Sequence, residues 1–305
     1  MKQITIIIVL LVDKSVMVLD IYNYFKLHPR YNKLAGDGYL FVEYKCPVIS
    51  EEFELWTESH LITYVINGKK DWITGSKTYK LMAGDSLFVR KGVYRTKQYL
   101  EEEYCVILFF LNDDFIKRFI SENNNFLVKA DLNGSPGQIF PIKTNETFHS
   151  LMQSIFHYLK ERGNIPRKLV ELKFKELLFN IALNPENKEI VEYFKAVSHS
   201  TKTNLEDIMM INFRSDLSIT DFAKLCGRSL SSFKRDFNSL FNTTPSRWLM
   251  SKRLDYAKTL LQETDLSISE ICYESGFKNN SHFNSAFKTK FELAPGQFKQ
   301  KSLAK

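Results

Sequence analysis

The chain has 305 residues, enough for two domains, and its 44% hydrophobic and 14% aromatic content excludes a disordered chain and indicates buried cores. Lys and Arg exceed Asp and Glu by seven; residues 200–305 hold sixteen basic and eleven acidic residues, so five of those excess charges lie there. A positive field concentrated in one region is typical of nucleic-acid binding. The cysteines lack metal-ligand spacing, which favours a reducing cytoplasm: Cys46, Cys105, Cys226 and Cys272.

The first segment, residues 1–16, contains the apolar run Ile4–Val12. Nine residues are too few to span a bilayer, and Asp13 and Lys14 follow without a small-residue cleavage site. The run is either an extra strand or the product of an upstream translation start, because Met17 offers an alternative beginning. We therefore treat residues 1–16 as an extension and begin the first domain at residue 17.

Residues 17–144 are predicted to form a β-barrel domain. Runs of β-branched and aromatic residues are separated there by N-G, T-G-S, A-G-D and K-G turn signals. About eight short antiparallel strands indicate a barrel or jelly roll. The predicted strands are Tyr39–Tyr44, Phe53–Trp56, His60–Ile66, Asp71–Thr74, Lys77–Leu81, Ser86–Arg90, Tyr94–Tyr99 and Tyr104–Leu111.

Residues 145–183 change to helical spacing and predict two antiparallel helices separated by Arg162–Pro166. Each helix has an apolar stripe that either supplies a dimer interface or packs on the chain's own barrel. The dimer candidates are Leu151, Ile155, Leu159 and Leu172. Residues 184–203 then read as a linker with a short helix at Lys188–Val197, and Asn204 is expected to cap the first helix of a second domain, 204–305.

The second domain contains one pattern twice, at Leu217–Trp248 and at Leu266–Phe298. Each copy predicts a helix-turn-helix: a capping serine followed by an acid, a short amphipathic helix, a glycine suited to positive φ, and a second helix. The equivalent pairs are Ser218 and Ser267, Asp221 and Glu270, Gly227 and Gly276, Phe233 and Phe283, Phe237 and Phe287, Phe241 and Phe291, and Pro245 and Pro295.

The outward side chains of each second helix are suited to reading a DNA major groove, because Arg pairs with guanine, Asn with adenine, and Ser with bases or phosphates. Any one of them taken alone is more typical of a solvated helix face, but together, on two equivalent helices, they favour DNA binding. The candidates are Ser231, Ser232, Lys234 and Arg235 in the first copy and Asn280, Ser281, His282, Asn284 and Ser285 in the second, with Arg228, Lys278 and Lys288 expected on phosphates.

Between the copies, Ser246–Gln262 predicts a connecting helix. Roughly sixteen residues at 1.5 Å each span about 24 Å. Successive major-groove faces lie about 34 Å apart. We therefore expect both second helices on one face of the duplex, with the DNA bent if their separation is shorter than that spacing.

Residues 205–301 closely resemble the DNA-binding domain of the AraC/XylS transcription regulators. The motifs are R-L-x-x-A-K-x-L-L (Arg253–Leu261), I-S-E-I-C-Y-E-S-G-F (Ile268–Phe277), S-H-F-N-S-A-F-K (Ser281–Lys288) and F-x-x-x-P-x-x-F (Phe291–Phe298). The resemblance covers about a third of the chain and is highly specific. It implies base contacts at Ser231, Lys234 and Arg235 in the first copy, and at Asn280, Ser281 and Asn284 in the second.

Three positions depart from the family pattern. The usual glycine after the third repeated aromatic residue is Asn242 in the first copy and Glu292 in the second. Glutamate tolerates the left-handed conformation poorly, so the second terminal turn is expected to differ. Cys272 replaces the usual alanine, a change between small core residues.

The resemblance also implies a cupin-like N-terminal domain that senses a small molecule, with Tyr64, Trp72 and Phe88 as pocket candidates. Filling the core is the alternative role of these aromatic residues. The strand region Lys77–Gly92 is similar to the N-terminal domain of type III secretion activators, in which a protein partner exerts control. No metal and no catalysis are expected, because His60 is the one histidine of the strand region and Tyr94 stands where a ligand histidine would be.

The expected molecule is thus an α+β protein of two domains, a cupin-like β-barrel with two helices and an all-α tandem helix-turn-helix domain. The resemblance implies a cytoplasmic, sequence-specific activator without a cofactor. Its expected partners are promoter DNA, RNA polymerase, an inducer or regulatory protein, and a second copy of the chain. The alternatives are a non-specific architectural DNA binder with an oligomerising N-terminal domain, and a ligand-binding barrel whose tandem motif contacts protein.

Overall fold

A computed structural model describes residues 19–29, 31–45, 52–74, 77–99, 101, 103–123, 137–160, 165–199 and 205–303. The chain divides into two compact units, and residues 18–203 form one while residues 204–305 belong to the other. The extension 1–16, Met17, Cys46 and the linker end 200–204, with its expected cap Asn204, lie outside the described residues. No helix in the part that the structure describes is long and apolar enough to cross a membrane.

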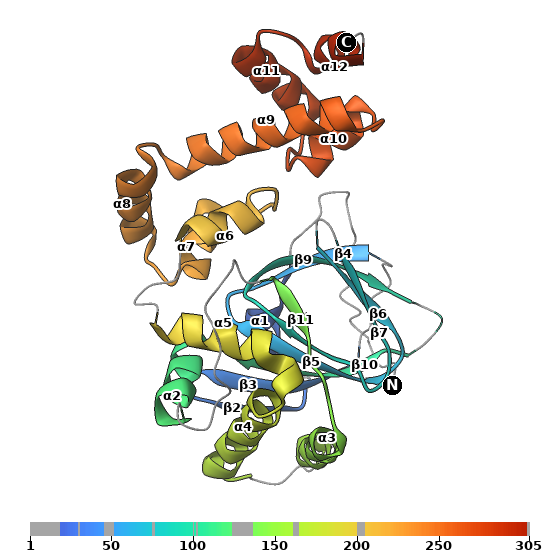
Figure 1. Ribbon diagram of the computed structural model, residues 1–305, viewed down its shortest axis with the longest axis vertical. Coiled ribbons are helices and arrows are strands. Elements are labelled where there is room, and N and C mark those ends of the chain that lie inside the picture. The colour runs from blue at the N-terminus through green and yellow to red at the C-terminus, as the bar shows by residue number, and fades with distance from the viewer. Residues whose placement is uncertain are drawn as a thin grey trace, which may run out of the picture. The chain divides into compact units, whose positions relative to one another are not determined.

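The N-terminal unit is built from two facing sheets (Figure 1). One has the strand order β1-β4-β9-β6-β7 and the other β11-β8-β5-β10-β3-β2. Each predicted strand is found with its ends within two residues: β3 (Tyr39–Lys45), β4 (Glu52–Thr57), β5 (His60–Asn67), β6 (Lys70–Ile73), β7 (Thr78–Leu81), β8 (Ser86–Val89), β9 (Gly92–Gln98) and β10 (Cys105–Leu111). All pairings are antiparallel except β1 with β4. Two such sheets form the double-sheet arrangement expected of a jelly roll.

Strand β10 shows why the six-stranded sheet lies at the centre of this unit. All seven of its residues are buried, because both faces of the sheet are covered. Val106, Leu108 and Phe110 point into the cluster between the sheets, whereas Ile107 and Phe109 point into a second cluster beneath helices. The alternation of the strand therefore serves two cores at once.

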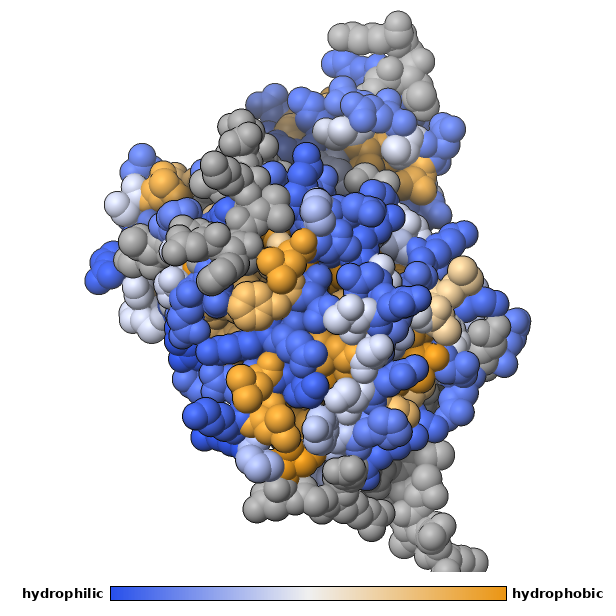
Figure 2. Space-filling model, turned by 60° about the horizontal axis from the view of Figure 1, so that its bottom comes forward, coloured by the Kyte–Doolittle hydropathy of each residue, from blue (hydrophilic) through white to orange (hydrophobic). Residues whose placement is uncertain are grey.

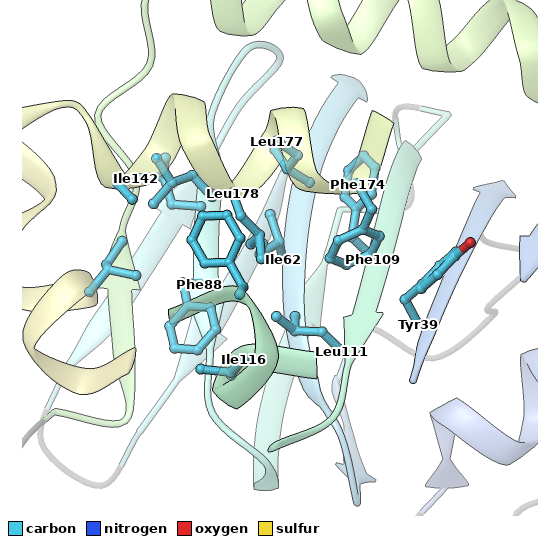
Figure 3. Packing of buried hydrophobic residues seen from close by; sticks show 14 of the residues in the cluster. Tyr39, Ile62, Phe88, Phe109, Leu111, Ile116, Ile142, Phe174, Leu177 and Leu178 are labelled. Atoms are coloured by element: carbon cyan, nitrogen blue, oxygen red, sulfur yellow. The ribbon is translucent and has the colours of Figure 1, made fainter. Parts of the chain in front are cut away.

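Four helices cover the outer face of that sheet: α2 (Asp113–Asn123), α3 (Glu146–Lys160), α4 (Arg167–Ala182) and α5 (Lys188–His199). Figure 3 shows Phe174 of α4 beside Phe109 of β10, and Phe174 also stacks on Phe41, with 4.9 Å between ring centroids. The predicted helical pair is thus integral to the first unit. A short 3-10 helix, Pro185–Asn187, joins α4 to α5.

The expected dimer stripe is corrected by this packing. Leu151, Ile155 and Leu159 are buried in the protomer's own core, so a second copy cannot reach them. Leu172 on α4 is 56% exposed. The face of the molecule in Figure 2 is largely hydrophilic, with separate hydrophobic areas rather than one continuous band.

Several short elements were not predicted. They are β1 (Leu19–Asp20), α1 (Ile21–Leu27), β2 (Lys33–Gly36), β11 (Ile139–Pro141) and helix α2. Helix α5 is also two residues longer than the helix expected in the linker.

The C-terminal unit is all α, which confirms the predicted fold class. Its helices are α6 (Leu205–Asn212), α7 (Ile219–Leu225), α8 (Leu230–Phe241), α9 (Pro245–Glu263), α10 (Ile268–Glu274), α11 (Asn280–Phe291) and α12 (Pro295–Leu303). Helices α7 and α8 form the first helix-turn-helix, α10 and α11 the second, and α9 is the predicted connecting helix. Its 19 residues correspond to a length of about 28 Å.

Candidate nucleic-acid interface

The first helix of each motif starts with the same reciprocal cap. The Asp221 amide donates to the Ser218 hydroxyl over 3.2 Å, and the Ser218 amide donates to the Asp221 carboxylate over 3.2 Å. Ser267 and Glu270 repeat the pair, and the hydrogen bonds from Ser267 hold the pKa of Glu270 below its usual value. The caps satisfy amides that a helix start leaves open, so both motifs begin in the same way.

The turn and the second helix of each motif also follow the prediction. Gly227 and Gly276 adopt φ values of +63° and +87°, which an L side chain rarely adopts. Phenylalanines four residues apart then bury one face of each second helix: Phe233 and Phe237 on α8, Phe283 and Phe287 on α11. Their spacing turns the intervening polar residues away from the core. We call α8 and α11 the reading helices.

On α8, the structure brings the predicted polar residues together at the N-terminal end. Ser231, Lys234 and Arg235 are exposed, and Ser232 is half-buried. The Arg235 side chain is 76% exposed, and its Nη2 lies 3.4 Å from both a carboxylate oxygen of Asp236 and the Ser232 hydroxyl. It therefore remains available for a ligand.

Arg228 does not have the free guanidinium that a phosphate contact requires. Its side chain is only 11% exposed and its Nε lies 3.2 Å from a carboxylate oxygen of Asp236. Its Nη1 donates to the Cys226 carbonyl over 2.9 Å, at the end of α7. Arg228 thus ties the turn of the first motif to α8.

On α11, the exposed set is Ser281, His282, Asn284, Ser285 and Lys288. Lys278, before the helix, pairs with Asp216 at 2.7 Å, but 72% of its side chain is exposed. The cap of α11 is Asn279, whose Oδ1 accepts hydrogen bonds from the amides of Ser281 and His282 and which was not among the predicted residues. Its position one residue before the helix was the available signal.

Asn280 differs from the other predicted reading residues because its amide is already engaged. It is half-buried, and its Nδ2 donates to the Ser269 hydroxyl of α10 over 3.1 Å. Its Oδ1 is buried and has no hydrogen-bond partner among the residues that the structure describes. The side chain is therefore held against α10 rather than extended into solvent.

The two motifs end alike, which corrects the expected difference at Glu292. Asn242 has φ +51° and Glu292 has φ +64°, so both residues follow their helix in the left-handed conformation. Cys272 is fully buried, and burial raises the pKa of its thiol to about 11. A protonated thiol of this kind acts as a small core residue.

The three pocket candidates of the first unit are not brought together. Trp72 lies in the cluster between the sheets, whereas Tyr64 and Phe88 lie on the helix-covered face. The Tyr64 hydroxyl meets Nδ1 of His149 at 3.1 Å, and Phe88 packs on Phe194 of α5. Among the described residues, no three His, Cys, Asp or Glu side chains are grouped closely enough to hold a metal ion.

Comparison with known proteins agrees with both units. Residues 60–193 match the ExsA N-terminal regulatory domain and residues 222–301 match a helix-turn-helix domain. The virulence regulon transcriptional activator VirF of Yersinia enterocolitica is 25% identical over 242 residues, which cover 79% of this chain and 89% of VirF. The regulator ExsA of Pseudomonas aeruginosa is 25% identical over 226 residues, 73% of this chain and 80% of ExsA.

A solved structure of ToxT from Vibrio cholerae aligns with a TM-score of 0.37 at 13% identity, over 86% of this chain and 97% of ToxT. The two sequence matches together place a regulatory domain before a helix-turn-helix domain in the chain. Both units are therefore similar to parts of known transcription regulators, in agreement with the resemblance of the sequence to the AraC/XylS family.

Proposed function

We propose that the protein is a sequence-specific, DNA-binding transcription activator whose N-terminal unit receives the controlling signal. The observation that carries the proposal is the presence of two equivalent helices, α8 and α11, that bury their phenylalanines and expose hydrogen-bonding side chains at their N-terminal ends. A helix-turn-helix places this part of its second helix in the major groove.

In this proposal Arg235, Ser281 and Asn284 address base edges, because each is exposed and carries hydrogen-bonding groups that distinguish bases. Lys278 and Lys288 address phosphates, which supply affinity without sequence preference. Arg228 is left out of the contact set because Asp236 and the Cys226 carbonyl already occupy it.

The direction of regulation is proposed from the relatives. VirF is named a transcriptional activator, and the N-terminal match is to a regulatory domain. Activation implies contact with RNA polymerase in the cytoplasm, and control by an inducer or by a regulatory protein bound to the first unit. A homodimer would use an exposed surface such as that around Leu172 instead of the buried α3 stripe.

The test compares two exposed cations, Arg235 and Lys278, whose side chains are similarly accessible. DNA sites are first selected by the full-length protein from a randomised duplex library, and affinity is then measured on the selected site and on each single-base change. Arg235→Ala should lose about 1–3 kcal/mol and relax discrimination at one base pair, whereas Lys278→Ala should weaken all sequences equally. Uniform weakening by both variants would instead indicate an architectural DNA binder.

A further inference from the structure

A four-residue segment that precedes α7 of the first motif contacts the connecting helix α9 and the second motif. We call residues 213–216 the bridge loop. Arg253, from the middle of α9, donates its Nε to the Phe213 carbonyl over 2.7 Å and its Nη2 to the Ser215 carbonyl over 2.8 Å. Arg253 is half-buried, and a guanidinium in such a place requires acceptors. The bridge loop supplies two.

The side chains of the bridge loop hold α9 as well. Arg214 donates to the Tyr256 hydroxyl over 3.1 Å, and its guanidinium lies 5.0 Å from the centre of the Tyr256 ring. Phe213 meets the same ring edge-on at 5.7 Å. The loop is therefore fastened to two successive turns of the connecting helix.

The other side of the bridge loop abuts the turn of the second motif. A Cβ atom at Gly276 would lie 2.5 Å from the Arg214 carbonyl oxygen, closer than real atoms approach. Asp216 pairs with Lys278 at 2.7 Å, two residues further along. At the equivalent glycine of the first motif, Gly227, a Cβ would meet no atom within 4 Å. The close approach thus belongs to the second motif alone.

These contacts add a second connection between the motifs. Helix α9 is the covalent one: its N-terminal half packs on the first motif, where Trp248 meets Phe237 and Phe241, and its C-terminal half packs on the second. Two bodies joined by one element can still turn about it. The bridge loop, held by Arg253 and pressed on the turn at Gly276, removes that freedom.

We propose that the bridge loop sets the spacing and angle at which α8 and α11 meet the duplex, with Arg253 as the positioning residue that holds the loop. The inference rests on the proposed function. Its consequence is selectivity for the distance between the two contacted DNA segments. One inserted base pair rotates the second segment by about 35°, a displacement that a rigid pair of helices cannot follow.

The test uses the full-length protein and duplexes that it selects from a randomised library, together with versions carrying one base pair added or removed between the contacted segments. The key variant is Gly276→Asn and the matched control is Gly227→Asn. Asparagine tolerates positive φ at both sites, so only the collision with the Arg214 carbonyl distinguishes the two.

The wild type and Gly227→Asn should prefer the selected spacing by about tenfold or more, because a misplaced second helix forfeits at least one base contact. Gly276→Asn and Arg253→Gln should lose about tenfold in affinity on the selected spacing and little on the altered ones, so the preference collapses. The ratio of affinities between spacings is the quantity compared, because any contribution of the removed Arg253 charge is the same at every spacing and cancels in that ratio.

Retention of the wild-type preference by both Gly276→Asn and Arg253→Gln, or an equal loss at every spacing, would overturn the role of the bridge loop. Failure of the wild type to select any DNA sequence would instead overturn the proposed function. The two failures are therefore distinguishable in one set of measurements.

Discussion

At the scale of single residues, the most unusual group is a buried polar cluster at one end of the first unit. His60 is fully buried; its Nε2 lies 2.8 Å from a carboxylate oxygen of Asp113, and its Nδ1 faces the Lys91 amide at 3.3 Å. An acceptor role for Nδ1 assigns the ring proton to Nε2, so the ring is neutral. The Lys91 ammonium, 2.7 Å from the other oxygen of Asp113, is then the cation that balances this carboxylate.

Burial lowers the pKa of His60, although the hydrogen bond to Asp113 opposes the shift. Burial raises the pKa of Asp113, but hydrogen bonds from His60 and Lys91 and their charges outweigh it, so its pKa lies well below the usual range. Because His60 is neutral, the positive charge that lowers the pKa of Asp113 is that of Lys91. A proton that binds His60 or Asp113 in the unfolded chain but not in the folded cluster stabilises the unfolded state and so destabilises the fold.

This cluster predicts acid sensitivity. An unfolded histidine binds its proton near pH 6.5, whereas buried His60 does so only at lower pH, so the free energy of unfolding should fall as pH decreases below about 6.5. The slope for His60 approaches 1.4 kcal/mol per pH unit. Asp113 adds its own loss below about pH 4, where the unfolded carboxylate is protonated first. His60→Gln should flatten the slope between pH 6.5 and 5.

The measurement is urea unfolding at several pH values in a Trp248→Phe background, which leaves Trp56 and Trp72 of the first unit as fluorescent reporters. His282→Gln is the control, because that histidine is exposed on α11. An unchanged slope in His60→Gln would show that the proton uptake takes place elsewhere.

Residue types were predictable, but their partners were not. The sequence pattern placed Arg228 beside the first reading helix and Asn280 at the start of the second. The engagement of Arg228 by Asp236 depends on the conformation of the turn before α8, and that of Asn280 by Ser269 depends on how α10 and α11 cross, which no spacing within one helix specifies. Arg235 and Lys288, by contrast, are exposed as their positions on the helices indicated.

At the scale of elements, the ends of the reading helices offer a direct comparison. Glu292 and Asn242 occupy equivalent left-handed positions, but only asparagine tolerates this conformation well. Glu292→Gly should therefore stabilise the C-terminal unit by about 0.5–1 kcal/mol, with Asn242→Gly nearly neutral as the matched control. Chemical denaturation monitored at Trp248 measures both. Equal effects of the two substitutions would mean that Glu292 is unstrained.

Helices and strands with a repeating apolar pattern were predictable from the sequence. Short elements that form because of their contacts with neighbouring elements were not. The eight strands that were predicted have alternating or aromatic runs between turn residues, and α3, α4 and α9 have long apolar stripes. Strands β1 and β11 have only two and three residues and pair with strands distant in the sequence, whereas β2, with four residues, forms a hairpin with the adjacent β3. The stripe on α3 predicted a buried face but could not say that Phe174 and the sheet, not a second copy, cover it.

At the scale of the whole molecule, the two units of the chain have different expected roles. The N-terminal unit contains the two sheets and the helices that cover the six-stranded sheet. The C-terminal unit contains every predicted DNA contact. The composition suggested this separation, because most of the excess positive charge lies in the last third of the sequence. The sequence could not show which of those cations are free. That distinction decides how the molecule should respond to salt.

Two lysines on α11 differ in whether their charge is already paired within the protein. Lys288 is exposed on α11, whereas the Lys290 ammonium bonds to the Ser251 carbonyl at 3.0 Å and hydroxyl at 2.7 Å and to Asp255 at 2.7 Å. A lysine that contacts a phosphate releases counterions, and its loss should reduce the slope of log affinity against log salt by about 0.9.

Lys288→Ala should therefore lower the slope by about that amount in the full-length protein bound to its selected DNA site. Lys290→Ala removes the same charge from the same helix but should leave the slope near that of the wild type, because its charge already serves α9. Titrations between low and moderate salt measure both slopes. Equal reductions would mean that Lys290 leaves Asp255 for the phosphate backbone, so that the contact between α11 and α9 opens when DNA binds.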